Sequence, residues 1–266
     1  MEFGEIFSNA LKYPVSDYQK LLMVGLVFIV ASLPAVLALF GFYNSTFSTI
    51  WSIVSLIISI LFLGYGLSVI RQSIDLNDEI PAFDWANNLV DGIKSFVVSF
   101  VYYLVPAIIV SIISIISLGS AFSTLPKSAI DAMGNATTTN AFINAIPPQT
   151  WAALGYGLAV VAIVAIILFI IFGLFQTVAT CRLAKYGSLG EAFAFGEVYG
   201  DIKKIGILKL LGFLIVLAII ASVIGAVIGL LALIPFIGII IGYLIGNSFI
   251  LLFANRAIGL LYSDVE

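Results

Sequence analysis

Long stretches without a charged side chain are the feature that most constrains this fold. Residues 21–70 contain none, and neither do residues 210–255. Each of these stretches is long enough for two membrane crossings of about 20 residues with a turn between them. Residues 95–126 and 132–181 each supply one further crossing. The sequence therefore predicts six transmembrane helices, at about residues 21–42, 47–70, 95–119, 151–180, 208–233 and 236–255.

Ten of the eleven basic residues lie in alternate gaps between the apolar stretches, and only Lys127 lies in a gap on the opposite side. Lys and Arg near the ends of spans are retained in the cytoplasm. The pattern thus predicts a multi-pass protein of the cell membrane with both termini cytoplasmic. The predicted cytoplasmic residues are Lys12, Lys20, Arg71, Lys94, Arg182, Lys185, Lys203, Lys204, Lys209 and Arg256.

Composition agrees with this class and excludes others. Charged residues make up 9% of the chain and the mean hydropathy is +1.21, which excludes a soluble globular domain. We expect residues 1–266 to form a single membrane domain whose partners are membrane lipids and other membrane proteins. The formal net charge of −3 argues against nucleic acid as a partner. Because the chain has no histidine and one cysteine, we expect no metal, cofactor or catalytic residues.

The predicted fold is an all-α bundle of three hairpins, each preceded by an amphipathic helix at the cytoplasmic interface. These lead-in segments have apolar residues at helical spacing and charged residues opposite them. Asp84 is expected to cap the second lead-in, and Ser188 with Glu191 has capping-box spacing before the third. The three segments read FGEIFSNALKYP, FDWANNLVDGIKSF and SLGEAFAFGEVYGDIKK.

An arginine follows each returning span, at Arg71, Arg182 and Arg256. The favoured interpretation is that each side chain reaches the lipid headgroups and fixes the depth of its span. The alternative is a ring of three arginines that pair with acidic residues of the neighbouring lead-in segments. The two interpretations are compatible.

Two sequons, which begin at Asn44 and Asn135, both fall on the predicted external side. Asn135 is the better candidate for glycosylation because it lies in a loop rich in Ser, Thr, Asn and Pro. A short amphipathic helix is expected nearby, from Lys127 to Met133. Asn44 lies close to the membrane.

Glycines at intervals of four residues predict close helix packing, because small side chains let two helix backbones approach. We expect these glycines to pack the last two spans into a tight hairpin, with dimerisation as the alternative. The glycines are Gly225 and Gly229 in the fifth span and Gly238, Gly242 and Gly246 in the sixth. Pro34 and Pro106 are expected to kink the first and third spans.

A resemblance to a known family is carried by the runs NALKYPVSDYQKLLMVG, GYGLSVIRQS…IPAFDWANNLVDGIKS and GSLGEAFAF. These runs resemble an archaeal family of polytopic membrane proteins, domain-of-unknown-function family 4013. The resemblance covers nearly the whole chain and implies an archaeal cell membrane. It implies no activity and no catalytic residues. Its markers here are Ala10-Leu11, Tyr13-Pro14, Pro81, Trp85 and Asp91-Gly92.

The leading functional hypothesis is a non-enzymatic scaffold that organises a membrane complex or the bilayer, with a docking surface at Asn87, Asp91 and Lys94. The second is a passive permease or carrier for a small neutral or lipid-like solute, supported by Pro34, Pro106 and Asn247. The third is an intramembrane enzyme. A filled core would favour the scaffold, whereas a polar cavity at mid-depth would favour the carrier.

Overall fold

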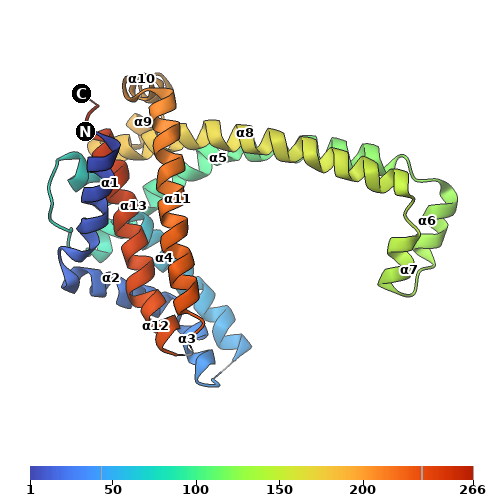
Figure 1. The fold of residues 1–266 in the computed structure, drawn as a ribbon, viewed down its shortest axis with the longest axis horizontal. Helices are drawn as coiled ribbons and strands as arrows, with labels where there is room; N and C mark the ends of the chain where they lie inside the picture. The colour runs from blue at the N-terminus through green and yellow to red at the C-terminus, as the bar shows by residue number, and fades with distance from the viewer. Residues whose placement is uncertain (43, 235, 266) are drawn as a thin grey trace. The chain divides into compact units, whose positions relative to one another are not determined.

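The computed structural model describes residues 1–42, 44–234 and 236–265, and every regular element in these ranges is a helix (Figure 1). One element, η2, is a π-helix, and η1 is a short 3₁₀ turn. In chain order the elements are α1 (Phe3–Lys12), η1 (Tyr13–Val15), α2 (Tyr18–Ala31), α3 (Leu33–Leu39), α4 (Ser45–Ile74), α5 (Trp85–Phe122), α6 (Lys127–Gly134), α7 (Thr139–Asn144), α8 (Pro148–Tyr186), α9 (Leu189–Ala192), α10 (Phe195–Ile205), α11 (Ile207–Leu231), α12 (Ile237–Ile241), η2 (Gly242–Gly246) and α13 (Asn247–Tyr262).

Five helices of the described chain have the length and hydropathy of a membrane span. They are α4, α5, α8, α11 and the continuous segment Gly242–Tyr262. A sixth is counted if the bent pair Phe3–Val15 and Tyr18–Ala31, which meet at 78°, forms one span. The prediction of an all-helical, multi-pass, membrane-embedded protein is therefore confirmed.

The first predicted span, 21–42, is wrong as a continuous helix. α2 ends at Ala31 and α3 begins at Leu33, with Pro34 in the first turn of α3. Proline lacks the N–H that would continue the helical ladder, so the break falls where the kink was expected. α2 alone has 14 residues, which corresponds to about 21 Å and is shorter than a bilayer core of about 30 Å.

The second lead-in is not a separate helix, which corrects the prediction for this segment. It forms the first turns of α5, which runs without interruption for 38 residues. Asp84 caps α5 as expected, since the backbone N–H groups of Ala86 and Asn87 both donate to its Oδ1 at 3.1 Å. No glycine turn or proline separates Lys94 from the span that follows, so the helix simply continues.

The first and third lead-ins do form separate helices, α1 and α10. Pro14 lies in the turn that ends α1, and Gly206, at φ 94°, separates α10 from α11. The capping box expected at Ser188 is absent, because the Ser188 side chain makes no capping hydrogen bond to α9. The Glu191 side chain instead pairs with Arg182.

The sixth span also differs from its predicted bounds of 236–255. It is divided into α12, the π-helix η2 and α13, and it continues to Tyr262. A π-helix holds one more residue in a turn than an α-helix does, and such turns are rare. The glycines Gly242 and Gly246 are the first and last residues of η2.

The described chain divides into two compact units, residues 1–99 with 174–265 and residues 100–173. In the first unit α13 is central and packs against α4, α1, α2 and α11. In the second unit the Tyr103 and Phe169 rings of α5 and α8 lie 6.0 Å apart, and the hydroxyls of Thr124 and Thr150 lie 3.2 Å apart. A single membrane domain over residues 1–266 stays a prediction.

Candidate functional site

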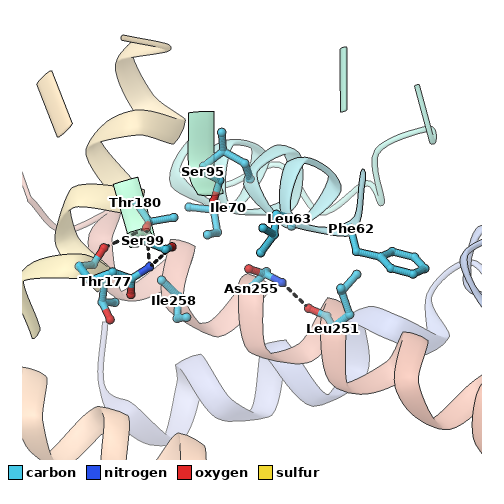
Figure 2. Close-up of a pocket in the computed structure, with 13 residues that line it drawn as sticks. Phe62, Leu63, Ile70, Ser95, Ser99, Thr177, Thr180, Leu251, Asn255 and Ile258 are labelled. Carbon is cyan, nitrogen blue, oxygen red and sulfur yellow. Dashed lines mark hydrogen bonds between the residues drawn. The ribbon is translucent and has the colours of Figure 1, made fainter. Parts of the chain in front are cut away.

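The first unit contains a cavity of about 230 Å³ between α4, α5, α8 and α13. The hydroxyl-bearing side chains of α5 and α8 gather at one end with Ile70 and Ile258 among them, and Phe62 and Leu63 lie at the other end, beside Asn255 (Figure 2). No charged side chain of the described chain lines it. The lining residues are Phe62, Leu63, Gly66, Leu67, Ile70, Ser95, Ser99, Gln176, Thr177, Thr180, Leu251, Asn255 and Ile258.

The Gln176 side chain is fixed by hydrogen bonds at the end of the cavity that carries the hydroxyl groups. Its Nε2 donates to the Ser99 hydroxyl at 3.0 Å and to the Thr180 hydroxyl at 3.1 Å. The Thr180 hydroxyl donates in turn to the Gln176 backbone carbonyl at 2.9 Å. The network joins α5 to α8, so this end of the cavity is held in one arrangement.

Asn255 of α13 supplies a second amide (Figure 2). Its Nδ2 donates to the Leu251 carbonyl at 2.8 Å. Its Oδ1 has no hydrogen-bond partner among the residues that the structure describes. Gly66 of α4 makes room for this amide, because a Cβ at Gly66 would lie 2.9 Å from Nδ2.

Ser95 is the polar residue of the cavity whose hydroxyl has no protein partner within the described part of the chain. Its side chain is buried, with 4% of the residue exposed. Buried hydroxyls are normally hydrogen-bonded. Because Ser95 lines the cavity, its hydroxyl is available to whatever occupies that space.

The three arginines lie beside the cavity, at the ends of the helices that form it, and each pairs with a carboxylate. Arg71 of α4 binds Asp91 of α5 at 2.9 Å, and its Nε donates to the Ala184 carbonyl at 2.9 Å. Lys94 lies 3.6 Å from the same Asp91 and donates to the Gly187 carbonyl at 3.1 Å.

Arg182 of α8 joins α9 and α10. Its Nη1 binds the Asp201 carboxylate at 2.8 Å, its Nε donates to the Glu191 carbonyl at 3.0 Å, and its Nη2 binds the Glu191 carboxylate. The Tyr262 hydroxyl donates to Asp201 at 2.6 Å. Asp201 is therefore satisfied from two helices.

Arg256 of α13 is the most buried of the three, with 1% of the residue exposed. Its Nε donates to Asn9 Oδ1 at 3.0 Å, its Nη1 donates to the Asn77 carbonyl at 2.6 Å, and its Nη2 pairs with Asp78. The guanidinium also lies over the Tyr13 ring, 4.8 Å from its centroid. Burial raises the pKa of the Tyr13 hydroxyl above its usual range, so this ring stays neutral.

These contacts bear on two interpretations. Arg182 and Arg256 form the internal ion pairs of the alternative interpretation, and both guanidinium groups are enclosed by protein partners; a role of the three arginines as membrane-depth anchors stays a prediction. Of the predicted docking surface, Asn87 is exposed, whereas Asp91 and Lys94 are engaged with each other and with neighbouring segments.

The glycines predicted to pack the last two spans have different surroundings. Gly225 and Gly229 have no atom within 4 Å of a Cβ position, so the predicted GxxxG contact in α11 is absent from the described structure. Gly242 and Gly246 do face α11, because a Cβ on these residues would lie 3.2 and 2.6 Å from the Ile228 side chain. Gly238 lies against the carbonyl of Leu231.

Four further close helix contacts use glycines that the sequence analysis did not predict to pack helices together. A Cβ at Gly64 of α4 would lie 1.8 Å from the Asn88 carbonyl oxygen, and one at Gly92 of α5 would lie 1.9 Å from the Ile60 carbonyl oxygen. A Cβ at Gly25 would lie 1.8 Å from the Leu244 carbonyl oxygen, and one at Gly259 would lie 2.4 Å from the Ser73 Cβ. Small residues are common in apolar runs, so only the helix partners identify these four.

The two sequon asparagines, Asn44 and Asn135, have different structural surroundings. Asn44 caps α4, and its Oδ1 accepts from the Phe47 backbone N–H at 2.9 Å. Asn135 is exposed just after α6, which forms where a short helix was expected. Its Nδ2 donates to the Asp131 carbonyl at 2.8 Å. Glycosylation of either residue stays a prediction.

Comparison with known proteins places the chain in a family. The model of the family described as protein of unknown function (DUF4013) matches residues 47–233. The chain belongs to this family. The DUF4013 match covers the cavity residues of α4, α5 and α8, whereas Asn255 of α13 lies beyond it. Neither a curated protein nor a solved structure matches the chain.

The sequence did not indicate the polar residues of the cavity, although each is a polar residue in an apolar stretch. Ser111, Ser114 and Ser117 form a comparable polar stripe on α5, but the Ser114 hydroxyl donates to the Val110 carbonyl of its own helix. Asn247, the other polar residue considered, lies in a second cleft with Ala35 and Tyr243.

Proposed function

We propose that this protein is a non-enzymatic passive carrier or permease for a small neutral solute. The observation that supports this proposal is the uncharged polar cavity of α4, α5, α8 and α13. Polar side chains in a membrane span are costly unless they have partners. Six polar residues nevertheless converge on one space from three helices: Ser95, Ser99, Gln176, Thr177, Thr180 and Asn255.

The chemistry of the cavity favours a neutral solute. A desolvated ion needs an opposite charge or several oriented dipoles, and the lining residues offer only hydroxyl and amide groups. At about 30 Å³ for each water molecule, 230 Å³ corresponds to roughly seven or eight waters. A solute of a few carbon and oxygen atoms fits this space.

The proposed orientation places both termini in the cytoplasm of an archaeal cell membrane, with six spans in three hairpins. The N-terminal ammonium lies 2.5 Å from the Asp264 carboxylate, which supports termini on the same side. The distribution of Lys and Arg supports the cytoplasmic side. The cavity lies nearer the arginine ends of its helices than the mid-depth position expected of a carrier, so in this orientation it is displaced toward the cytoplasmic side.

The test is solute flux into vesicles. The purified protein is reconstituted in proteoliposomes, and the entry of glycerol and of sucrose is followed by stopped-flow light scattering. We expect glycerol to enter faster than into protein-free liposomes, and sucrose, which is larger than the cavity, to be excluded. Equal rates with and without protein would refute the proposal.

A matched pair of substitutions assigns the flux to this cavity. Ile258 lines the cavity, so Ile258→Trp should fill it and abolish glycerol entry. Ile219 is exposed on α11, so Ile219→Trp makes the same change away from the cavity and should leave the flux unchanged. Loss of flux in both variants, or in neither, would dissociate transport from the cavity.

A scaffold remains the second candidate, and a specific observation favours it. Two arginine–carboxylate pairs and the Arg256–Asn9 hydrogen bond fasten the lead-in segments to the returning spans, which gives an ordered surface. Asn87 is exposed on this surface. If a partner docks there, Asn87→Arg should release a copurifying membrane protein while the glycerol flux is retained. A copurification pattern that does not change would remove Asn87 as a docking residue.

A further inference from the structure

We infer that the solute is a small polyol held between the Ser95 hydroxyl on α5 and the Asn255 amide oxygen on α13. This inference rests on the proposed function and names the class of solute that the cavity takes. Both residues line the cavity, and they belong to different helices (Figure 2). A polyol can meet both groups, because each of its hydroxyls both donates and accepts a hydrogen bond.

Ser95 supplies the solute contact on α5. Its hydroxyl lacks a hydrogen-bond partner within the described chain, although only 4% of the residue is exposed. The Ser95 Oγ is open to the cavity rather than fully enclosed by protein. The neighbouring Ser99 hydroxyl, by contrast, accepts from Gln176 at 3.0 Å. An occupant of the cavity can therefore bond directly to the Ser95 hydroxyl, which marks Ser95 as the point of attachment.

Asn255 supplies the solute contact on α13. Its Nδ2 is used by the Leu251 carbonyl, so the amide presents Oδ1, an acceptor, to a solute donor. Gly66 sets the position of the amide, because a Cβ on that residue would lie 3.1 Å from Oδ1 as well as 2.9 Å from Nδ2. The solute must therefore bring at least one O–H or N–H donor.

The mixed lining distinguishes a polyol from an amide such as urea. The hydroxyl-bearing residues Ser95, Ser99 and Thr180 gather at one end of the cavity with Ile70 and Ile258 among them, and Phe62 and Leu63 lie at the other end, beside Asn255 (Figure 2). A polyol has C–H groups for the apolar side chains and hydroxyls for the polar ones. Urea is polar along all of its edges, so contact with Phe62 and Leu63 would leave part of it without hydrogen bonds.

The experiment compares glycerol with urea in proteoliposomes that contain the full-length protein. We expect the protein-dependent entry of glycerol to exceed that of urea. We expect Ser95→Ala and Asn255→Leu each to lower the glycerol rate by roughly three- to tenfold, the equivalent of one hydrogen bond. Ser95→Thr keeps a hydroxyl and should restore most of the rate.

A control in the same helix separates recognition from general damage to α5. The Ser114 hydroxyl donates to the Val110 carbonyl rather than to the cavity, so Ser114→Ala should leave both rates unchanged. Melting temperatures in detergent establish that each variant is folded. If Ser95→Ala fails to fold, Asn255→Leu and Ser95→Thr carry the test.

The outcomes separate the two proposals. If glycerol enters but Ser95→Ala and Asn255→Leu have no effect, the solute contacts are wrong and the carrier function stands. If urea enters faster than glycerol, the solute is an amide and the polyol assignment is overturned. If neither solute enters faster than into protein-free liposomes, the proposed function fails and the inference fails with it.

Discussion

Arg256, in the last helix, donates its Nε–H to the side-chain oxygen of Asn9, in the first helix, at 3.0 Å. Arg71 and Arg182, near the ends of the earlier returning spans, likewise bind a side chain of the next lead-in segment, through Nη2 and Nη1. In each case the acceptor is followed three residues later by a lysine. The triplets are Arg71, Asp91 and Lys94; Arg182, Asp201 and Lys204; and Arg256, Asn9 and Lys12. The Arg256–Asn9 hydrogen bond thus joins the last returning span to the first lead-in segment.

The Arg256–Asn9 hydrogen bond can be removed by a substitution at Asn9. Asn9→Leu removes the acceptor of a buried guanidinium N–H, and an unsatisfied donor of this kind costs about 1 to 3 kcal/mol. We expect the unfolding free energy in detergent to fall by that amount. Asn140 is exposed on α7, so Asn140→Leu serves as the control and should change stability by less than about 0.5 kcal/mol. Equal effects would show that the Arg256 contact does not hold α1 in place.

The two carboxylates that share Arg182 should differ in importance. The Asp201 side chain is 8% exposed and the Glu191 side chain is 43% exposed. Asp201→Asn breaks a buried pair, so we expect a loss of about 3 kcal/mol. Glu191→Gln breaks a partly solvated pair, so we expect a loss below about 1 kcal/mol. Chemical denaturation of the two variants measures both values, and the reverse order would contradict this account of the cluster.

The close approach of α4 and α5 predicts a large effect of one methyl group. Gly64→Ala would place a Cβ 1.8 Å from the Asn88 carbonyl oxygen, so the helices must separate at a cost of about 1 to 3 kcal/mol or more. Gly225→Ala meets open space and should be neutral or slightly stabilising. Thermal unfolding of both variants tests the contrast. A stable Gly64→Ala protein would mean that these two helices are less tightly packed.

A related contrast applies to the last two spans. A Cβ at Gly242 would lie 3.2 Å from the Ile228 side chain, whereas one at Gly229 would meet no atom of another segment within 4 Å. Gly242→Leu should therefore separate α11 from η2 and lower the melting temperature in detergent. Gly229→Leu, the matched control, should leave it unchanged. A melting temperature that Gly242→Leu does not alter would indicate that this glycine faces lipid.

The sequence predicted features that depend on neighbouring residues better than features that depend on contacts between distant segments. Charge-free stretches reflect local composition, so three of the six predicted spans lie within α4, α5 and α8, and a fourth, 208–233, matches α11 except for its last two residues. The break at Pro34 and the cap at Asp84 were local too, and both were expected. Spacing could not reveal that α5 continues through its lead-in, because an amphipathic end and an apolar centre can belong to one helix.

The candidate site depended on contacts between distant segments, so the sequence revealed little of it. Ser95, Gln176 and Asn255 are isolated polar residues in three stretches, and only the packing of α5, α8 and α13 brings them together. The arginines were identified, but the favoured interpretation assumed exposed side chains. Burial of Arg256 beside Asn9 follows from the pairing of the first and last helices, which no local pattern records.

The six-span topology predicts that the two ends of α5 lie on opposite sides of the membrane. Asn87 is exposed in the first turn of α5, and Asn135 is exposed just after α6, beyond the other end of α5. In a Cys181→Ser background, Asn87→Cys should react with a membrane-impermeant maleimide in inside-out vesicles, and Asn135→Cys should react in right-side-out vesicles. Cys181 is buried, so the protein without either new cysteine should stay unlabelled in both preparations. Labelling of both positions from the same side would rule out a crossing by α5 and, with it, the six-span arrangement.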